Sequence, residues 1–110
     1  MAFDEHLANR VRELLSAHRG VQEKVMFGML AFLIDGKMAV AASGQAGLLV
    51  RVPPSDTDAL LERKHVSPMV MSGRRSRGWV FVADDGVATK RQLQSWVSRG
   101  VAYAQSLPAK

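Results

Sequence analysis

The sequence predicts an α+β fold, a largely antiparallel sheet of about five strands with helices packed on it. Both ends of the chain show the apolar periodicity of amphipathic helices, and the middle shows β-rich apolar runs. The links between these runs are short, which requires antiparallel pairing. At 110 residues the chain has the size of one domain. We therefore expect a single domain, residues 1–110, in the order helix, three strands, helix, two strands, helix.

The first helix is expected over residues 4–18. Asp4 can accept hydrogen bonds from the first-turn amides, and Gly20 can supply the left-handed residue that follows a helix end. Apolar residues recur at the spacing of one helix face, namely Phe3, Leu7, Val11, Leu14 and Leu15.

Three strands are expected next, over residues 29–34, 37–41 and 48–52. Asp35 and Gly36 both tolerate a positive φ and therefore suit a tight hairpin turn between the first two strands. Pro53 and Pro54 lack amide donors and end the third strand. Ser55 is expected to cap a short helix that finishes near Lys64.

The second strand pair is expected over residues 68–71 and 79–82, joined by a loop over residues 72–78. The turn at residues 84–86 leads out of the sheet. Thr89 and Gln92 form a capping box at the start of the last helix, which ends before Pro108. Trp96 lies on its apolar face.

Composition excludes several classes of protein. With 47% apolar and 23% charged residues, the chain is neither disordered nor membrane-embedded in character. No apolar run could span a bilayer and no export signal is recognisable, so we expect a cytoplasmic protein without a membrane partner. The absence of cysteine excludes disulfides, thiolate metal sites and a thiol nucleophile.

The charge is unevenly distributed. Residues 1–62 carry six Lys/Arg and eight Asp/Glu, whereas residues 63–110 carry nine and two. A basic C-terminal half can attract nucleic acid, although it can also be a solvated face that keeps the protein soluble. The candidate phosphate contacts are Arg74, Arg75 and Arg77 in the loop, with Lys90 and Arg91 if the fold brings them near. A solvated hairpin loop is the alternative.

A second candidate surface, for a ligand or partner, contains Lys24, Phe27 and Gly28, because a glycine beside an aromatic residue permits close approach. The alternative is a core Phe27 beside a strand bulge at Gly28. Arg51, within a strand, is a candidate anion contact or one half of a cross-strand ion pair.

No residue pattern indicates catalysis, a metal or a cofactor. His6, His18 and His65 share no helical or strand spacing. The strand methionines could form a soft-metal site or a pliable docking groove, but thioethers are common gap-fillers in cores. These methionines are Met26, Met29, Met38, Met69 and Met71.

Several short segments, in order along most of the chain, resemble the TfoX N-terminal domain family. They are residues 24–32, 35–38, 50–52, 73–74, 78–80, 96–97 and 106–108. Two departures from the family's pattern are Met29, where a second glycine is frequent, and Ser76-Arg77, where Met-Lys is frequent.

The resemblance implies a compact α+β domain, found alone or ahead of a second domain in bacterial regulators of DNA-uptake competence, and it implies no catalytic residue. We expect the stand-alone form here. The function that follows is an accessory or regulatory interaction domain that binds a protein partner or nucleic acid, and a homodimer is compatible with it. A small-molecule pocket between sheet and helices is the alternative, and an unrecognised enzyme is a third.

Overall fold

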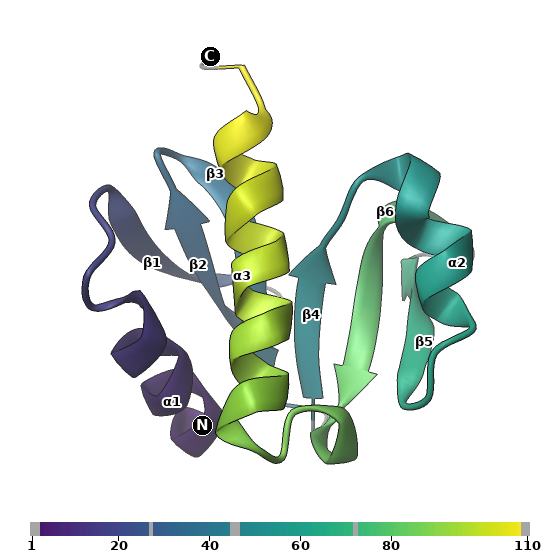
Figure 1. The fold of residues 1–110 in the computed structure, drawn as a ribbon, viewed down its shortest axis with the longest axis horizontal. Helices are drawn as coiled ribbons and strands as arrows, with labels where there is room; N and C mark the ends of the chain where they lie inside the picture. Colours follow the sequence, from purple (N-terminus) through teal and green to yellow (C-terminus); the bar gives the residue numbers. More distant parts are fainter. Residues whose placement is uncertain (1–2, 27, 45–46, 72, 109–110) are drawn as a thin grey trace.

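The computed structural model describes residues 3–26, 28–44, 47–71 and 73–108, and only the backbone of residues 71 and 74–76. The described residues form three α-helices, two short 3-10 helices and one six-stranded sheet (Figure 1). The helices are α1 (Glu5–Leu15), η1 (Pro54–Asp56), α2 (Thr57–Leu61), η2 (Asp84–Gly86) and α3 (Lys90–Ser106). The strands are β1 (Val21–Met26), β2 (Met29–Ile34), β3 (Lys37–Ser43), β4 (Gly47–Arg51), β5 (Val66–Met71) and β6 (Arg74–Ala83).

The sheet is antiparallel throughout, in the order β1-β2-β3-β4-β6-β5, and the α-helices lie on one of its faces (Figure 1). The predicted α+β class is therefore confirmed. The expected strand count was short by one because β1 was missed. Gln22, Glu23 and Lys24 are consecutive and exposed in this edge strand, so it lacks the apolar run that predicted the other strands.

The predicted starts of α1 and α3 are confirmed. The Leu7 amide donates to Asp4 Oδ1 over 3.1 Å at the start of α1, and Thr89 and Gln92 form a reciprocal capping box at the start of α3. Helix α1 ends at Leu15 rather than at residue 18. At the other end of α3, Lys37 Nζ donates to the Leu107 carbonyl over 2.7 Å, which satisfies one of the free carbonyls there.

The tight turn between β2 and β3 is confirmed, with φ of 52° at Asp35 and 83° at Gly36. Two other expectations are wrong. Ser55 does not cap a helix, since it lies inside η1 and the short helix α2 starts at Thr57 without a side-chain cap. Residues 74–78 are not loop but the first half of β6.

A bulge interrupts the pairing of β6 with β5, and this irregularity explains the difference from the predicted loop. Val70 of β5 pairs with Arg75, and Pro68 pairs with Val80. Between these two pairs β6 advances by five residues while β5 advances by two, so β6 contains extra residues that bulge out of the pairing. Within this bulge Gly78 has a φ of 91°, which favours glycine. Its amide donates to the Thr57 hydroxyl oxygen at 2.9 Å, and its carbonyl accepts from the Val52 amide at 2.8 Å.

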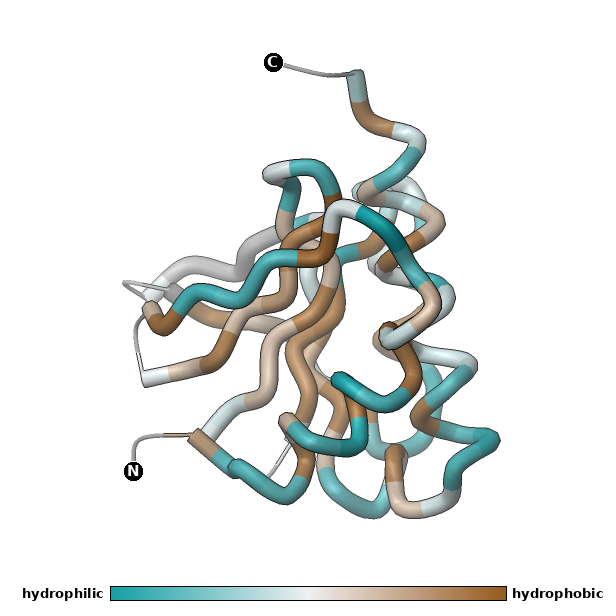
Figure 2. Tube along the Cα trace, turned by 90° about the vertical axis from the view of Figure 1, so that its left-hand side faces the viewer, coloured by the Kyte–Doolittle hydropathy of each residue, from teal (hydrophilic) through white to brown (hydrophobic). Residues whose placement is uncertain are grey.

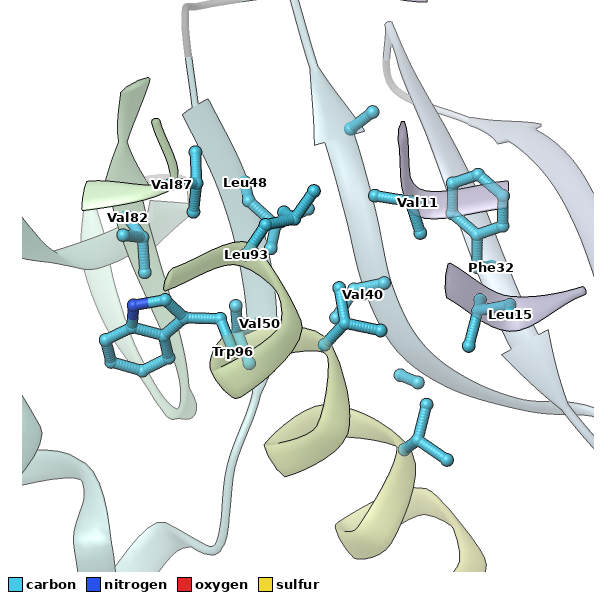
Figure 3. Close-up of a cluster of buried hydrophobic side chains, with 14 of the residues drawn as sticks. Val11, Leu15, Phe32, Val40, Leu48, Val50, Val82, Val87, Leu93 and Trp96 are labelled. Atoms are coloured by element: carbon cyan, nitrogen blue, oxygen red, sulfur yellow. The ribbon is translucent and has the colours of Figure 1, made fainter. Parts of the chain in front are cut away.

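The main hydrophobic core lies between the sheet and the helices. Trp96 is 4% exposed and extends from α3 toward Val82 and Val50 (Figure 3). Seen from the side, the hydrophobic colouring follows the central strands (Figure 2). The largest fully buried side chains are Val11, Phe32, Ile34, Val40, Leu48, Val50, Val52, Val80, Val82, Val87 and Leu93.

Candidate functional site

The face of the sheet opposite the helices carries a second apolar cluster. In β2, Leu30, Phe32 and Ile34 point into the main core, so the alternate residues point to this other face. We call it the methionine face. It consists of the buried residues Ala31, Ala41 and Leu49 and the partly buried residues Met26, Met29, Leu33, Met38, Met69 and Trp79.

Cross-strand pairing makes the methionine face continuous. Ala31 pairs with Ala41, Ala41 pairs with Leu49, and Leu49 pairs with Phe81, so one row crosses β2, β3, β4 and β6. Ala31 and Ala41 are fully buried, although no described helix belongs to this cluster. The longer side chains packed around them shield them from solvent and are themselves only partly buried.

The edges of the sheet are less suited to pairing with another chain than this face. β1 presents Gln22, Glu23 and Lys24, all exposed. At the other edge, β5 contains Pro68, which has no amide to donate. Charged residues and proline are the usual devices that prevent edge-to-edge pairing. The contact surface that the sheet offers is therefore its apolar face.

The second predicted surface lies at the border of the methionine face. Lys24 is exposed and pairs with Ala31, which places its side chain on the same side of the sheet. Gly28, with a φ of 74°, belongs to the connection between Met26 and Met29, so the expected strand bulge at this position is wrong. Phe27 lies outside the described residues.

The predicted phosphate contacts belong to two separate parts of the fold, the start of β6 and the start of α3. The side chains of Arg74 and Arg75 lie outside the described part of the chain, while Arg77 is exposed and reaches the Pro54 carbonyl at 3.3 Å and Asp58 at 3.7 Å. Lys90 and Arg91 begin α3, which follows the far end of β6 (Figure 1). The length of β6 thus separates the two groups.

Arg51 contacts aromatic rings. Its guanidinium carbon lies 5.5 Å from the ring centre of Trp79 and 5.8 Å from that of Tyr103, within the range of cation–π contacts. Of the ion pairs that the described residues form, none includes Arg51, in contrast to the cross-strand pair considered above. Sequence reasoning missed this arrangement because Tyr103 belongs to another element.

The methionine face had a signal in the sequence. All six residues of β2 are apolar, but successive side chains of a strand point to opposite faces of the sheet. Met29, Ala31 and Leu33 therefore lie on the face opposite the core residues Leu30, Phe32 and Ile34. Met26, Met29, Met38 and Met69 pack against a buried cluster, as expected of core gap-fillers, but they remain partly exposed.

Two hollows formed by described residues lie between α1 and α3, not between sheet and helices. One, of about 220 Å³, is lined by residues that include Leu15, His18, Val97 and Val101. The other, of about 130 Å³, is lined by Arg10, Glu13, Leu14, Lys90 and Leu93. In the described part of the chain, no three His, Asp or Glu side chains gather as metal ligands would, and each helix is too short or too polar to cross a bilayer.

The fold and this face define a class of small α+β domain, with one side of the sheet packed under helices and the other side apolar and open to contact. The family model described as the TfoX N-terminal domain matches residues 13–104, from within α1 to within α3. The chain belongs to the TfoX N-terminal domain family. No curated protein matches the chain, and no solved structure does.

Proposed function

We propose that this protein is a non-catalytic accessory or regulatory domain that binds a protein partner through the methionine face. The observation that supports this is the continuity of the face, an apolar row across four strands that no described helix covers. Contiguous apolar surface on a soluble domain marks an interaction site.

The residue types suit a protein partner. Thioether side chains are flexible and polarisable, so four methionines can adapt to the shape of an opposing surface. Trp79, partly buried at the border of the face, is the residue type that most often dominates binding energy in protein interfaces. A nucleic acid would instead require a basic groove, and the charged side chains that the described residues place on this side of the sheet include only Lys24 at its border and the partly exposed Arg51.

Photo-crosslinking in the native cell tests this proposal. A photoreactive amino acid replaces Met38, on the methionine face, and in a matched variant it replaces Ser95, which is exposed on α3 on the opposite side. We expect a discrete crosslinked protein from position 38 and none from position 95. Equal products from both positions, or none from position 38, would contradict the proposal.

A second variant distinguishes a specific contact from nonspecific adhesion. Met38→Asp places a charge on the face, and Ser95→Asp places the same charge on the helical side. We expect Met38→Asp to abolish the crosslink formed from a reporter at Met69 and Ser95→Asp to leave it unchanged. Sedimentation of the purified protein shows whether the partner is a second copy of the chain.

A further inference from the structure

Three arginines beside α3 are held against aromatic rings. The guanidinium carbons of Arg63 and Arg99 lie 4.7 Å and 5.6 Å from the ring centre of Trp96. Arg51 lies near Trp79 and Tyr103, as described above. We call these six residues the arginine–aromatic cluster, comprising Arg51, Arg63, Arg99, Trp79, Trp96 and Tyr103.

The cluster forms one strip along α3. Trp96, Arg99 and Tyr103 are separated by three and four residues, so they share one face of the helix and span a rise of about 10 Å. Arg63 follows the end of α2 and contacts the Trp96 ring, while Arg51 ends β4 and contacts the Tyr103 ring. Three guanidiniums therefore lie against rings that share one face of α3.

Their charge is not neutralised within the described part of the protein. The ion pairs found there join Arg12 to Glu23 and Arg77 to Asp58, and none of those between described residues includes a cluster arginine. Arg99 Nε is buried and has no hydrogen-bond partner among the described residues. A ring contact leaves the guanidinium charge in place, so these three side chains can still attract an anion.

The rings also orient the guanidiniums. A guanidinium stacked on an indole loses rotational freedom but keeps the donors at its edge available. A ligand that meets such pre-oriented donors does not have to immobilise three long side chains on binding. The forked edge of arginine matches the oxygen geometry of phosphate.

We propose that the arginine–aromatic cluster binds a ligand with several linked phosphate groups. Three positive charges spread over about 10 Å of helix match a chain of phosphates better than a single anion. The ligand is either a nucleic acid strand or a free polyphosphate, which share this chemistry. This site adjoins the methionine face at Trp79 and at Arg51, which pairs with Trp79 across β4 and β6.

Binding of two probes tests the proposal. The first probe is a fluorescent single-stranded oligodeoxythymidylate, measured by anisotropy at low salt, and the second is inorganic tripolyphosphate, measured by displacement of the first. We expect the oligonucleotide to bind, with a log-log salt slope of about −2 because each phosphate contact on a single strand contributes about −0.7. Displacement by tripolyphosphate identifies phosphate alone as sufficient, and binding without displacement identifies a nucleic acid strand as the ligand.

A charge-matched pair of variants locates the site. Arg63→Gln with Arg99→Gln removes two charges from the cluster, whereas Arg19→Gln with Arg91→Gln removes two exposed charges elsewhere. We expect the first pair to weaken binding by at least about tenfold and the second pair by much less. No binding of either probe at low salt, or equal losses in both pairs, would overturn the proposal.

Two further measurements exclude a folding artefact. Arg63→Gln alone changes an exposed side chain, so the fold should survive and binding should still fall. Arg51→Lys keeps the charge but removes the planar fork, and we expect it to weaken binding by several fold while the thermal unfolding curve stays unchanged. Full binding by both single variants would place the phosphate contact outside the cluster.

Discussion

The two faces of the sheet are built from the same strands but differ in residue type and in burial. On the helical side, branched aliphatic residues such as Val50 and Val82 are fully buried beneath α3. On the methionine face, small residues such as Ala31 and Ala41 occupy the centre, and long flexible side chains surround them and stay partly exposed. We therefore expect substitutions on the packed side to lower the free energy of unfolding more than substitutions on the methionine face.

The two tryptophans provide the largest expected difference between the faces. Trp96 is 4% exposed, so Trp96→Ala should lower the free energy of unfolding by about 3–5 kcal/mol, a large part of the stability of a small domain. Trp79 is only partly buried, so Trp79→Ala should lower it by about 1–2 kcal/mol. Urea denaturation of both variants measures the two values. If Trp79→Ala proved as harmful as Trp96→Ala, the methionine face would be part of the structural core.

Gly100 tests how closely α3 packs on the sheet. A Cβ atom there would lie 2.6 Å from the Ala39 carbonyl oxygen, which belongs to the backbone of β3 and cannot rotate away. Overpacking costs about 1–3 kcal/mol, and the better helix propensity of alanine returns about 1 kcal/mol.

We therefore expect Gly100→Ala to destabilise the protein by about 1 kcal/mol, measured as a lower urea midpoint. The control is Ser98→Ala, an exposed position on the same helix, which should be neutral or slightly stabilising. A stabilising Gly100→Ala would show that α3 lies farther from β3 than described.

The Arg12–Glu23 ion pair, which links α1 to β1, provides the smallest expected effect. The 2.7 Å hydrogen bond from Arg12 holds the pKa of Glu23 below its ordinary value of 4.5. A carboxylate with a lowered folded-state pKa stabilises the fold above its unfolded pKa, and this contribution is lost as pH falls through the folded pKa.

Arg12→Gln should therefore cost about 0.2–1 kcal/mol at pH 7, since the side chains are 42% and 36% exposed, and should cost nothing at a pH below the folded pKa of Glu23. Denaturation of both proteins at the two pH values checks this. Glu13→Gln, an exposed carboxylate outside the described ion pairs, should show no such pH dependence. A cost of the same size at both pH values would exclude the ion pair as its cause.

Local chemistry made much of the fold predictable. The Asp35-Gly36 turn, the Thr89–Gln92 capping box and the ends of β2 follow from residues adjacent in sequence. The edge strand β1 and the first half of β6 could not be predicted in this way, because β1 is polar and β6 is bulged at Gly78. Their pairing depends on neighbours distant in the chain.

The candidate sites were less predictable than the fold. Arg51 is a candidate in the sequence, but its ring partners Trp79 and Tyr103 belong to β6 and α3, distant from it in the chain. Arg63 and Arg99 both contact Trp96, a contact that depends on the packing of α2 near α3. The run of residues 74–77 predicts a basic site because three arginines are close together in the sequence. Convergence in space, which sequence spacing does not report, distinguishes the cluster from the run.

Solvent access to the methionine methyl groups tests the central claim most directly. A soluble gadolinium chelate is added to dilute, methyl-labelled protein, and the loss of NMR signal is compared between the methyl groups of Met29, Met38 and Met69 and those of Val50 and Val82. We expect strong attenuation for the methionines and almost none for the buried valines. Methionine methyls as protected as the valines at every dilution would show that the face is already covered within the monomer and cannot receive a partner.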